Sequence, residues 1–235
     1  MPRILWCNPV GTPAFDPETA ALIEAVRLPQ FEPVVRSLAA GPPHLEYHTY
    51  EHQALGPMID LFREAEAGGC AAGIVGCFYD GGLRELREAV RMPVVGMAEA
   101  ALSLAATLGH RFSIIVGRRK WIPKMRDNVV LYGHERRLAS FRSVDMGIPE
   151  VAAQPDRFFQ RCLEQAERAV AEDGAEVVVL SEVATPAFWA RARKELEAPI
   201  LDPGVACWKA AEVAADLYER LGLTHSKVGG YEPPP

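Results

Sequence analysis

Two residues with proton-transferring side chains stand at matching places in the two halves of the chain. Cys77 follows the apolar run CAAGIVG (70–76), and Glu182 follows the run VVVL (177–180) after one serine. Such runs predict strands buried on both faces, where an unpaired carboxylate is costly. Ligands of parallel sheets bind beyond the carboxyl ends of the strands. The pair therefore indicates a thiol and a carboxylate that act on a bound ligand as acid and base.

The elements that must position these residues alternate between strand and helix. The alternation predicts an α/β fold with parallel sheets covered by helices on both faces. Apolar runs predict strands at 3–6, 70–77, 93–97, 112–116, 140–145, 175–180 and 199–202. Helical periodicity predicts helices near 17–27, 83–90, 99–109, 121–132, 155–172, 188–197 and 204–222.

The two halves of the chain repeat each other. Residues 70–109 and 174–222 both read as strand, polar turn, helix, proline-led strand, and a helix that ends in Leu-Gly. Cys77 falls on Glu182 at an offset of 105 residues, and the offset is almost constant along the match. Asn8, after the first strand, corresponds to the neighbourhood of Val116 and Gly117. This pattern is typical of an internal duplication.

The duplication predicts two pseudo-symmetric domains, each a mainly parallel sheet flanked by helices, with the active site in the cleft between them. We expect the first domain to span residues 1–98, completed by 208–235, and the second to span 99–207. If the carboxyl ends of the two sheets face each other, Cys77 and Glu182 approach one ligand from opposite sides.

Two such groups on opposite faces of a carbon can invert it, because one removes a proton and the other delivers one from behind. The carbanion between them needs stabilising. Backbone N–H groups at the two predicted helix starts, those of Phe78, Tyr79, Val183 and Ala184, are suited to bind the oxygen that takes up the charge. A helix start would also lower the pKa of the Cys77 thiol toward the working range.

Composition and motifs exclude several other functions. The net charge of −6, with scattered basic residues, gives no reason to expect nucleic acid or a membrane as partner. No segment reads as a membrane span or signal peptide, so we expect a cytoplasmic protein, and the five cysteines indicate reduced thiols. No glycine-rich phosphate motif is present, which argues against a nucleotide cofactor.

Several candidate residues also allow a structural interpretation. His44, His48 and His52 have a spacing known from metal sites, but they lack the glutamate of the zinc-protease motif, so a polar surface or a histidine reaching the cleft is favoured and no metal is expected. Cys77 is also compatible with a buried strand cysteine. Glu182 is also compatible with a helix cap or an ion pair.

The loops near these candidates allow two interpretations as well. Asn8 fits either a ligand contact or an Asx turn before a proline. Tyr79 fits a pocket wall or a helix cap, and Asp80 is favoured as a cap of the helix that follows it.

Longer stretches of the chain resemble a known family. Gly-Cys-Phe at 76–78 is followed by PVVGMAEAAL, RFSIIV, LYGHERRLASFRSVDMGIP and the ending LTHSKVGGYEPPP. Together these resemble the hydantoin and allantoin racemase branch of the aspartate/glutamate racemase superfamily. The resemblance implies a cofactor-independent two-domain α/β enzyme with a small-molecule substrate, expected to be a homo-oligomer. It makes Cys77 the first of two acid-base cysteines and places Tyr231 near the entrance of the active site. Tyr231 fits a pocket wall or an oligomer contact, and a disordered chain end is the alternative.

Three loops depart from the family pattern. Gly-Cys-Ala-Gly-Met is replaced by SEVAT at 181–185, so that Glu182 stands where the second cysteine belongs. Asn-Pro-Asn-Thr is replaced by NPVGT at 8–12, which keeps Asn8 and Thr12 as expected substrate contacts. Thr-Thr after the third main strand is replaced by Val-Gly at 116–117.

A thiol facing a carboxylate supports more than one reaction. With ordinary pKa values of about 8.5 and 4.3, the carboxylate is the natural base and the thiol the natural acid. The leading hypothesis is a racemase or isomerase that acts next to a carbonyl of a small, hydantoin-like or carboxylate-bearing compound. A decarboxylase or lyase in which Cys77 protonates the carbanion is the alternative, and a non-catalytic small-ligand binder is a third.

Overall fold

Two parallel four-stranded sheets of the same strand order form the framework of the computed structural model, which describes residues 1–233. The orders are β2-β1-β3-β4 and β6-β5-β7-β8. The chain divides into two compact units, one formed by Met1–Met97 with the chain from Cys207 onward, the other by Ala98–Ala206. Each unit carries one sheet, so the predicted fold class, α/β with helices flanking parallel sheets, is confirmed.

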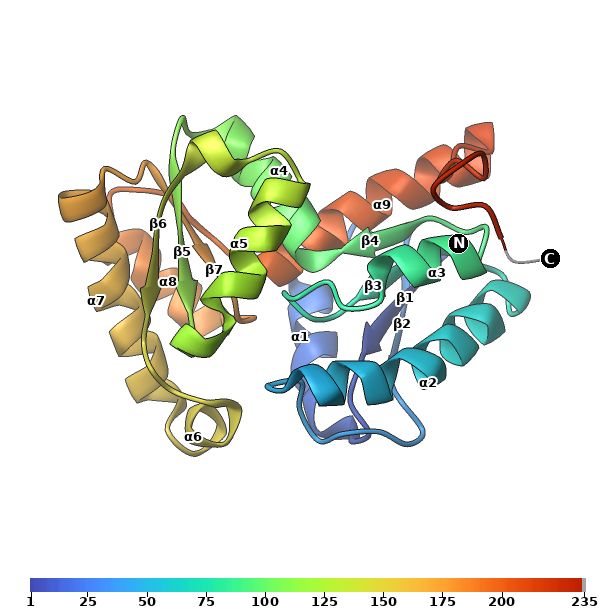
Figure 1. The fold of residues 1–235 in the computed structure, drawn as a ribbon, viewed down its shortest axis with the longest axis horizontal. Helices are drawn as coiled ribbons and strands as arrows, with labels where there is room; N and C mark the ends of the chain where they lie inside the picture. Colours follow the sequence, from blue (N-terminus) through green and yellow to red (C-terminus); the bar gives the residue numbers. More distant parts are fainter. Residues whose placement is uncertain (234–235) are drawn as a thin grey trace. The chain divides into compact units, whose positions relative to one another are not determined.

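The first unit holds strands β1 to β4. In Figure 1, α2 and α3 lie on one face of this sheet. The bounds are β1 (Arg3–Asn8), β2 (Glu32–Ser37), β3 (Cys70–Val75), β4 (Val94–Gly96), η1 (Pro13–Phe15), α1 (Asp16–Val26), α2 (His48–Ala67), α3 (Leu83–Ala89) and, from its fifth residue on, α9 (Pro203–Leu221).

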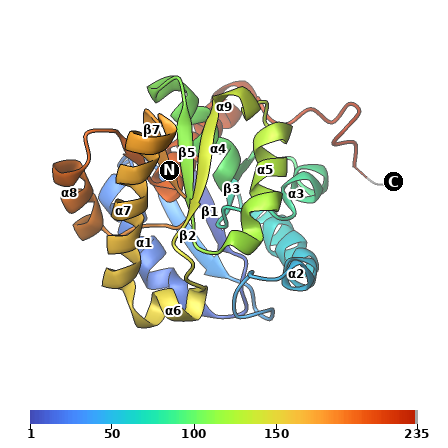
Figure 2. The ribbon, with the colours of Figure 1, turned by 60° about the vertical axis from the view of Figure 1, so that its left-hand side comes forward.

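The second unit holds strands β5 to β8, with α7 packed along three of them (Figure 2). The bounds are β5 (Phe112–Val116), β6 (Leu138–Ser143), β7 (Val177–Leu180), β8 (Ile200–Leu201), α4 (Met97–Leu108), η2 (Arg119–Trp121), α5 (Ile122–Leu131), η3 (Glu135–Arg137), α6 (Ile148–Ala153), α7 (Pro155–Asp173) and α8 (Pro186–Glu195).

The strand registers repeat between the two sheets. Gly73 of β3 pairs with Val94, and Val178 of β7 pairs with Ile200 at the same offsets that the sequence shows. A main-chain hydrogen bond at the carboxyl end of the two central strands also repeats. Gly76 N–H donates to the Cys7 carbonyl at 2.8 Å, and Ser181 N–H donates to the Ile115 carbonyl at 3.0 Å. The structure therefore bears out the internal repeat.

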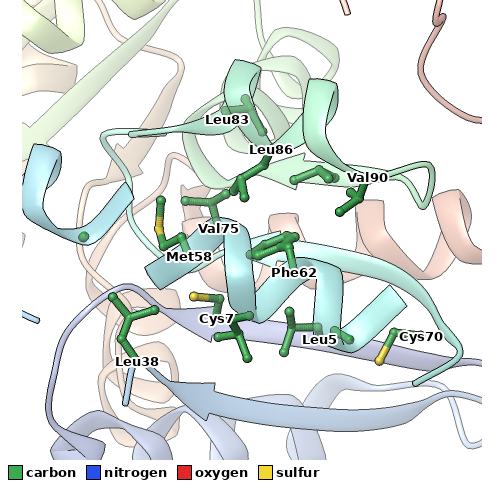
Figure 3. Packing of buried hydrophobic residues seen from close by; sticks show 14 of the residues in the cluster. Leu5, Cys7, Leu38, Met58, Phe62, Cys70, Val75, Leu83, Leu86 and Val90 are labelled. Carbon is green, nitrogen blue, oxygen red and sulfur yellow. The ribbon is translucent and has the colours of Figure 1, made fainter. Parts of the chain in front are cut away.

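The core of the first unit explains why its strands lack the polar alternation of half-exposed strands. Leu5 and Cys7 of β1 and Val75 of β3 are fully buried, and Met58 and Phe62 of α2 pack over them, as Figure 3 shows. The central strands are covered on both faces, which is the arrangement that continuous apolar runs predict.

Glycine is required at position 76, directly before Cys77, because the main chain there lies very close to Trp6 and Cys7. A Cβ at this position would lie 2.5 Å from Trp6 Nε1 and 2.6 Å from the Cys7 carbonyl oxygen. We expect Gly76→Ala to lower the free energy of unfolding by about 2 kcal/mol, because the core must shift to admit a methyl group. Urea denaturation measures this. Gly56→Ala in α2 is the control, since a Cβ there meets no atom within 4 Å, and an equal loss in both variants would contradict the steric explanation.

The sequence patterns did not predict one strand and two helices of the structure. β2 is an edge strand whose residues are half-buried or exposed and include a proline, so no apolar run marks it. α2 contains Gly56 and Pro57, which interrupt its helical signal. α6 is only 6 residues long and begins beside a proline. Among the described residues, no helix is long and apolar enough to cross a membrane.

Candidate functional site

Cys77 lies in a tight turn at the carboxyl end of β3. Its N–H donates to the Val75 carbonyl at 2.8 Å, and its own carbonyl accepts from Asp80 N–H at 3.1 Å. The thiol is half-buried, whereas Cys7, Cys70, Cys162 and Cys207 are buried. Burial raises the pKa of Cys70 and, more strongly, those of Cys7 and Cys162. Cys77 therefore combines partial exposure with a position at the ligand-binding edge of a parallel sheet.

The helix after Cys77 begins where its periodicity predicts, at Leu83, so the prediction that Phe78 and Tyr79 lie at a helix start is wrong. α3 begins at Leu83, and residues 77–82 form a turn in which Asp80 has a φ of 50°. The same holds for Glu182, since α8 begins at Pro186 with Thr185 as its N-cap. Helix dipoles thus do not act directly on either residue, because the effect falls off within one turn.

Asn8 ends β1, the strand next to β3, and its amide is held inside the fold. Its oxygen accepts from Trp6 Nε1 at 2.9 Å, and its nitrogen donates to Asp16 Oδ1 at 2.7 Å. Ser37 Oγ donates to the same Asp16 oxygen at 2.6 Å. Asn8 is 5% exposed, so its contacts position the loop after β1. Thr12 is the N-cap of η1, and its Oγ1 accepts from Ala14 N–H at 3.3 Å.

Glu182 lies at the carboxyl end of β7, one residue beyond the bond that joins Ser181 to β5. Its side chain is close to Gly117, because a Cβ built on Gly117 would lie 3.7 Å from Glu182 Oε1. The Glu182 carboxylate thus occupies the space beside Gly117, where a larger residue would place its side chain. It also contributes, after burial, to the raised pKa of Cys162.

The two N–H groups after Glu182 differ. Ala184 N–H donates to Asp202 Oδ2 at 2.8 Å, so this member of the predicted ligand set is engaged inside the fold. Within residues 1–233, neither Val183 N–H nor Phe78 N–H, which lies beside Cys77, takes part in a hydrogen bond. Phe78 and Val183 therefore keep the donors that the hypothesis requires for a substrate oxygen.

Asp202 is a buried acid that the sequence analysis overlooked. Besides Ala184 N–H, it accepts from Gly204 N–H at 2.6 Å and Val205 N–H at 3.1 Å, and so caps α9. Burial raises its pKa to about 6, and the backbone donors oppose this rise. The Asp-Pro-Gly sequence at 202–204 is a helix-start pattern that could have revealed the cap.

Other candidates have different surroundings. Tyr231 contacts Arg87, whose guanidinium carbon lies 5.9 Å from the ring centroid, and packs edge-on against His225. His48 and His52 are exposed on α2, while His44 precedes that helix, so the three histidines do not share one helix face. In residues 1–233 no group of three or more potential metal-ligating side chains occurs. Tyr79 is half-buried and packs against the core of its unit.

The structure thus gathers the candidates at two sheet edges. In the first unit, Asn8 ends β1, and Cys77 and Phe78 follow the neighbouring strand β3. Gly117, Glu182 and Val183 follow β5 and β7 in the second. Each set lies at the carboxyl end of the two central strands, the place where α/β sheets bind ligands.

The space beside Gly117 gives a testable expectation. A Cβ there would lie 3.0 Å from the Met146 carbonyl oxygen as well as against Glu182. The tight contact with Met146 requires a local adjustment, which would shift the carboxylate beside it. If Glu182 acts in catalysis, we expect Gly117→Ala to lower kcat about 10-fold, since small displacements of a reacting group are costly. Kinetic comparison with Gly56→Ala tests this, and unchanged kcat in a Gly117→Ala protein would show that the Glu182 position tolerates the shift.

Comparison with known proteins identifies the relatives of this chain. The family model described as Asp/Glu/Hydantoin racemase matches residues 4–211. The chain belongs to this family. A hydantoin racemase of Rhizobium meliloti is 33% identical over 193 residues, which cover 82% of this chain and 78% of the relative. The family assignment confirms the predicted superfamily and, with it, the prediction of an enzyme.

Solved structures of the racemase family have the same fold. Allantoin racemase from Klebsiella pneumoniae superposes with a TM-score of 0.91 at 28% identity, over 100% of this chain and 94% of that one. Allantoin racemase from Pseudomonas fluorescens superposes with a TM-score of 0.89 at 30% identity, over 99% and 97%. This racemase-family chain is therefore similar along its full length to proteins named allantoin racemase.

Proposed function

We propose that the protein racemises or isomerises a small substrate at a carbon next to a carbonyl, with Cys77 and Glu182 as the acid-base pair. The observation that carries the proposal is their equivalence in the repeat. Each residue comes directly after the residue whose N–H bonds to the neighbouring central strand, Gly76 in one unit and Ser181 in the other. A duplicated fold that faces one ligand would present such a pair from both sides.

The proton steps balance without a further reactant. The Glu182 carboxylate removes the α-proton, and the resulting carbanion places its charge on the adjacent carbonyl oxygen. The N–H groups of Phe78 and Val183 are the proposed donors to that oxygen. The Cys77 thiol then delivers its proton to the opposite face of the carbon. The enzyme is left with a thiolate and a carboxylic acid, which is the state required for the reverse direction.

The proposed substrate class is a hydantoin-like ring or a related carbonyl compound. It rests on the named relatives, which are hydantoin and allantoin racemases. The stereogenic carbon of such a ring is bonded to a ring carbonyl carbon, whose oxygen takes up negative charge when the α-proton leaves. A single enantiomer of allantoin and of a 5-substituted hydantoin should each be incubated with enzyme while optical rotation is followed.

The unequal ordinary pKa values of the pair favour a second candidate, one-sided protonation in a decarboxylase or lyase. Incubation in deuterated water separates the possibilities. Deuterium in substrate that is otherwise unchanged supports racemisation, whereas deuterium found only in a smaller product supports decarboxylation or elimination. Saturable binding with no exchange for any candidate substrate would contradict both and support a ligand-binding protein.

A further inference from the structure

Asp202 links the loop that carries Glu182 to the start of a helix. Its Oδ2 accepts from Ala184 N–H, two residues after Glu182, while its Oδ1 accepts from Gly204 and Val205 in the first turn of α9. Asp202 is 2% exposed. Both oxygens are used, so the residue ties a loop without regular structure to a helix of 19 residues.

Asp80 is the comparable buried acid of the other unit. It belongs to the loop after β3, whereas Asp202 follows the outer strand β8. A Cβ built on Gly96, the residue before α4, would lie 2.8 Å from both Cγ and Oδ2 of Asp80. The Asp80 carboxyl therefore lies at the start of α4 and is 8% exposed. Its main-chain N–H donates to the Cys77 carbonyl, and its own carbonyl accepts from Leu83 N–H. The N-cap of α3 is Gly82, and the cap interpretation of Asp80 stays a prediction.

The repeat makes these two arrangements reciprocal. Gly96 is the equivalent of Asp202, and Asp80 is the equivalent of Thr185 in the Glu182 loop. In the second unit, Asp202 follows the outer strand and its side chain contacts the Glu182 loop. In the first unit, Asp80 lies in the Cys77 turn and its side chain contacts the end of the outer strand. In each unit, therefore, one buried carboxyl lies between the candidate catalytic loop and the end of the outer strand, where the next helix begins.

We infer that Asp80 and Asp202 are positioning residues that hold the Cys77 turn and the Glu182 loop for the proposed reaction. The inference rests on the proposed function for the role of these loops, while the two tethers themselves are geometric. A catalytic group needs a fixed position, since a shift of about 1 Å costs about 100-fold in rate. Neither Cys77 nor Glu182 lies at the start of a helix that would fix its position. The Asp80 and Asp202 carboxyls are the groups that hold these loops instead.

The Asp202 tether is tested with Asp202→Asn and Asp202→Ala. Hydrogen–deuterium exchange of the peptide that contains residues 181–185 should accelerate about 10-fold, because Ala184 N–H loses its charged acceptor. The kcat should fall about 100-fold, with KM changed less than about 3-fold. The asparagine variant keeps the size of the side chain and serves if the alanine variant does not fold.

Glu212→Gln is the matched control. Glu212 is also a buried acid, 3% exposed, and accepts a backbone N–H from Leu28 at 2.6 Å and Trp208 Nε1 at 2.8 Å. We expect this variant to lose stability and to keep kcat. Equal loss of kcat in Glu212→Gln and Asp202→Asn would overturn the inference, as would faster exchange at 181–185 with unchanged kcat.

The Asp80 tether is tested with Asp80→Asn and Asp80→Gly, both of which tolerate the positive φ. Alkylation of Cys77 by iodoacetamide, followed by peptide mass spectrometry, should become about 5-fold faster, because a carboxylate three residues along the chain is removed and the turn loosens. Unchanged alkylation in both variants would overturn the assignment of Asp80. Amide exchange and alkylation need no substrate, so they decide on the tethers even if the proposed reaction fails.

Discussion

Replacing Cys77 with serine is expected to reduce the racemisation rate at least about 1,000-fold while leaving the melting temperature almost unchanged. A hydroxyl group is a far weaker acid than a thiol, and a positioned acid or base contributes about 100- to 10,000-fold to a proton-transfer step. The fold should survive, because Cys77 is half-buried and serine is nearly the same size. Optical rotation measures the rate, and circular dichroism during heating measures the melting temperature.

Cys70→Ser is the control for this result. Cys70 begins the same strand at its amino end and is buried. The substitution should lower stability slightly, because a hydroxyl group is more costly to bury than a thiol, and should leave kcat unchanged. A Cys77→Ser protein that racemises at the wild-type rate would remove Cys77 from the mechanism.

Replacing Glu182 with glutamine is expected to reduce racemisation about 1,000-fold, because the amide keeps the shape of the side chain but cannot accept the proton. Glu182→Cys should retain more activity than Glu182→Gln. It recreates the pair of thiols that the resemblance to hydantoin and allantoin racemases implies. The space beside Gly117 that the carboxylate fills accepts the smaller side chain without a clash.

Glu176→Gln is the control at the other end of the same strand. Glu176 precedes β7 and accepts from His110 N–H at 2.6 Å. Its loss should affect stability and leave kcat unchanged. Full activity in Glu182→Gln, with Glu176→Gln equally active, would make Glu182 a structural residue and would contradict the acid-base assignment.

Much of the fold could be predicted because its strands are buried on both faces. Runs such as FSIIV and VVVL have no polar alternation, and the near-constant offset between the halves reflects equal registers in the two sheets. The edge strand β2 and the long helix α2 could not be predicted in this way. The first is half-exposed, and the second carries a proline and a glycine in its interior.

The sequence supplies the two principal candidates, Cys77 and Glu182, whose roles stay predictions, but it does not show what supports their loops. Cys77 and Glu182 stand out because a thiol and a carboxylate interrupt apolar patterns at equivalent places. Their loops were expected to be helix starts, but the chain instead turns for several residues before α3 and α8. The tethers of Asp80 and Asp202 depend on contacts across 16 and 18 residues of sequence, which no local pattern contains.

The measurement that tests the pair most directly is enantiomer-specific exchange in deuterated water. Each enantiomer of a 5-substituted hydantoin is incubated separately with Cys77→Ser and with Glu182→Gln, and deuterium at the ring carbon is followed by NMR against an enzyme-free sample. If the two groups act on opposite faces, each variant exchanges only one enantiomer, the two variants exchange opposite enantiomers, and neither racemises. Exchange of the same enantiomer by both variants, or racemisation by either at the wild-type rate, would contradict the proposed pair.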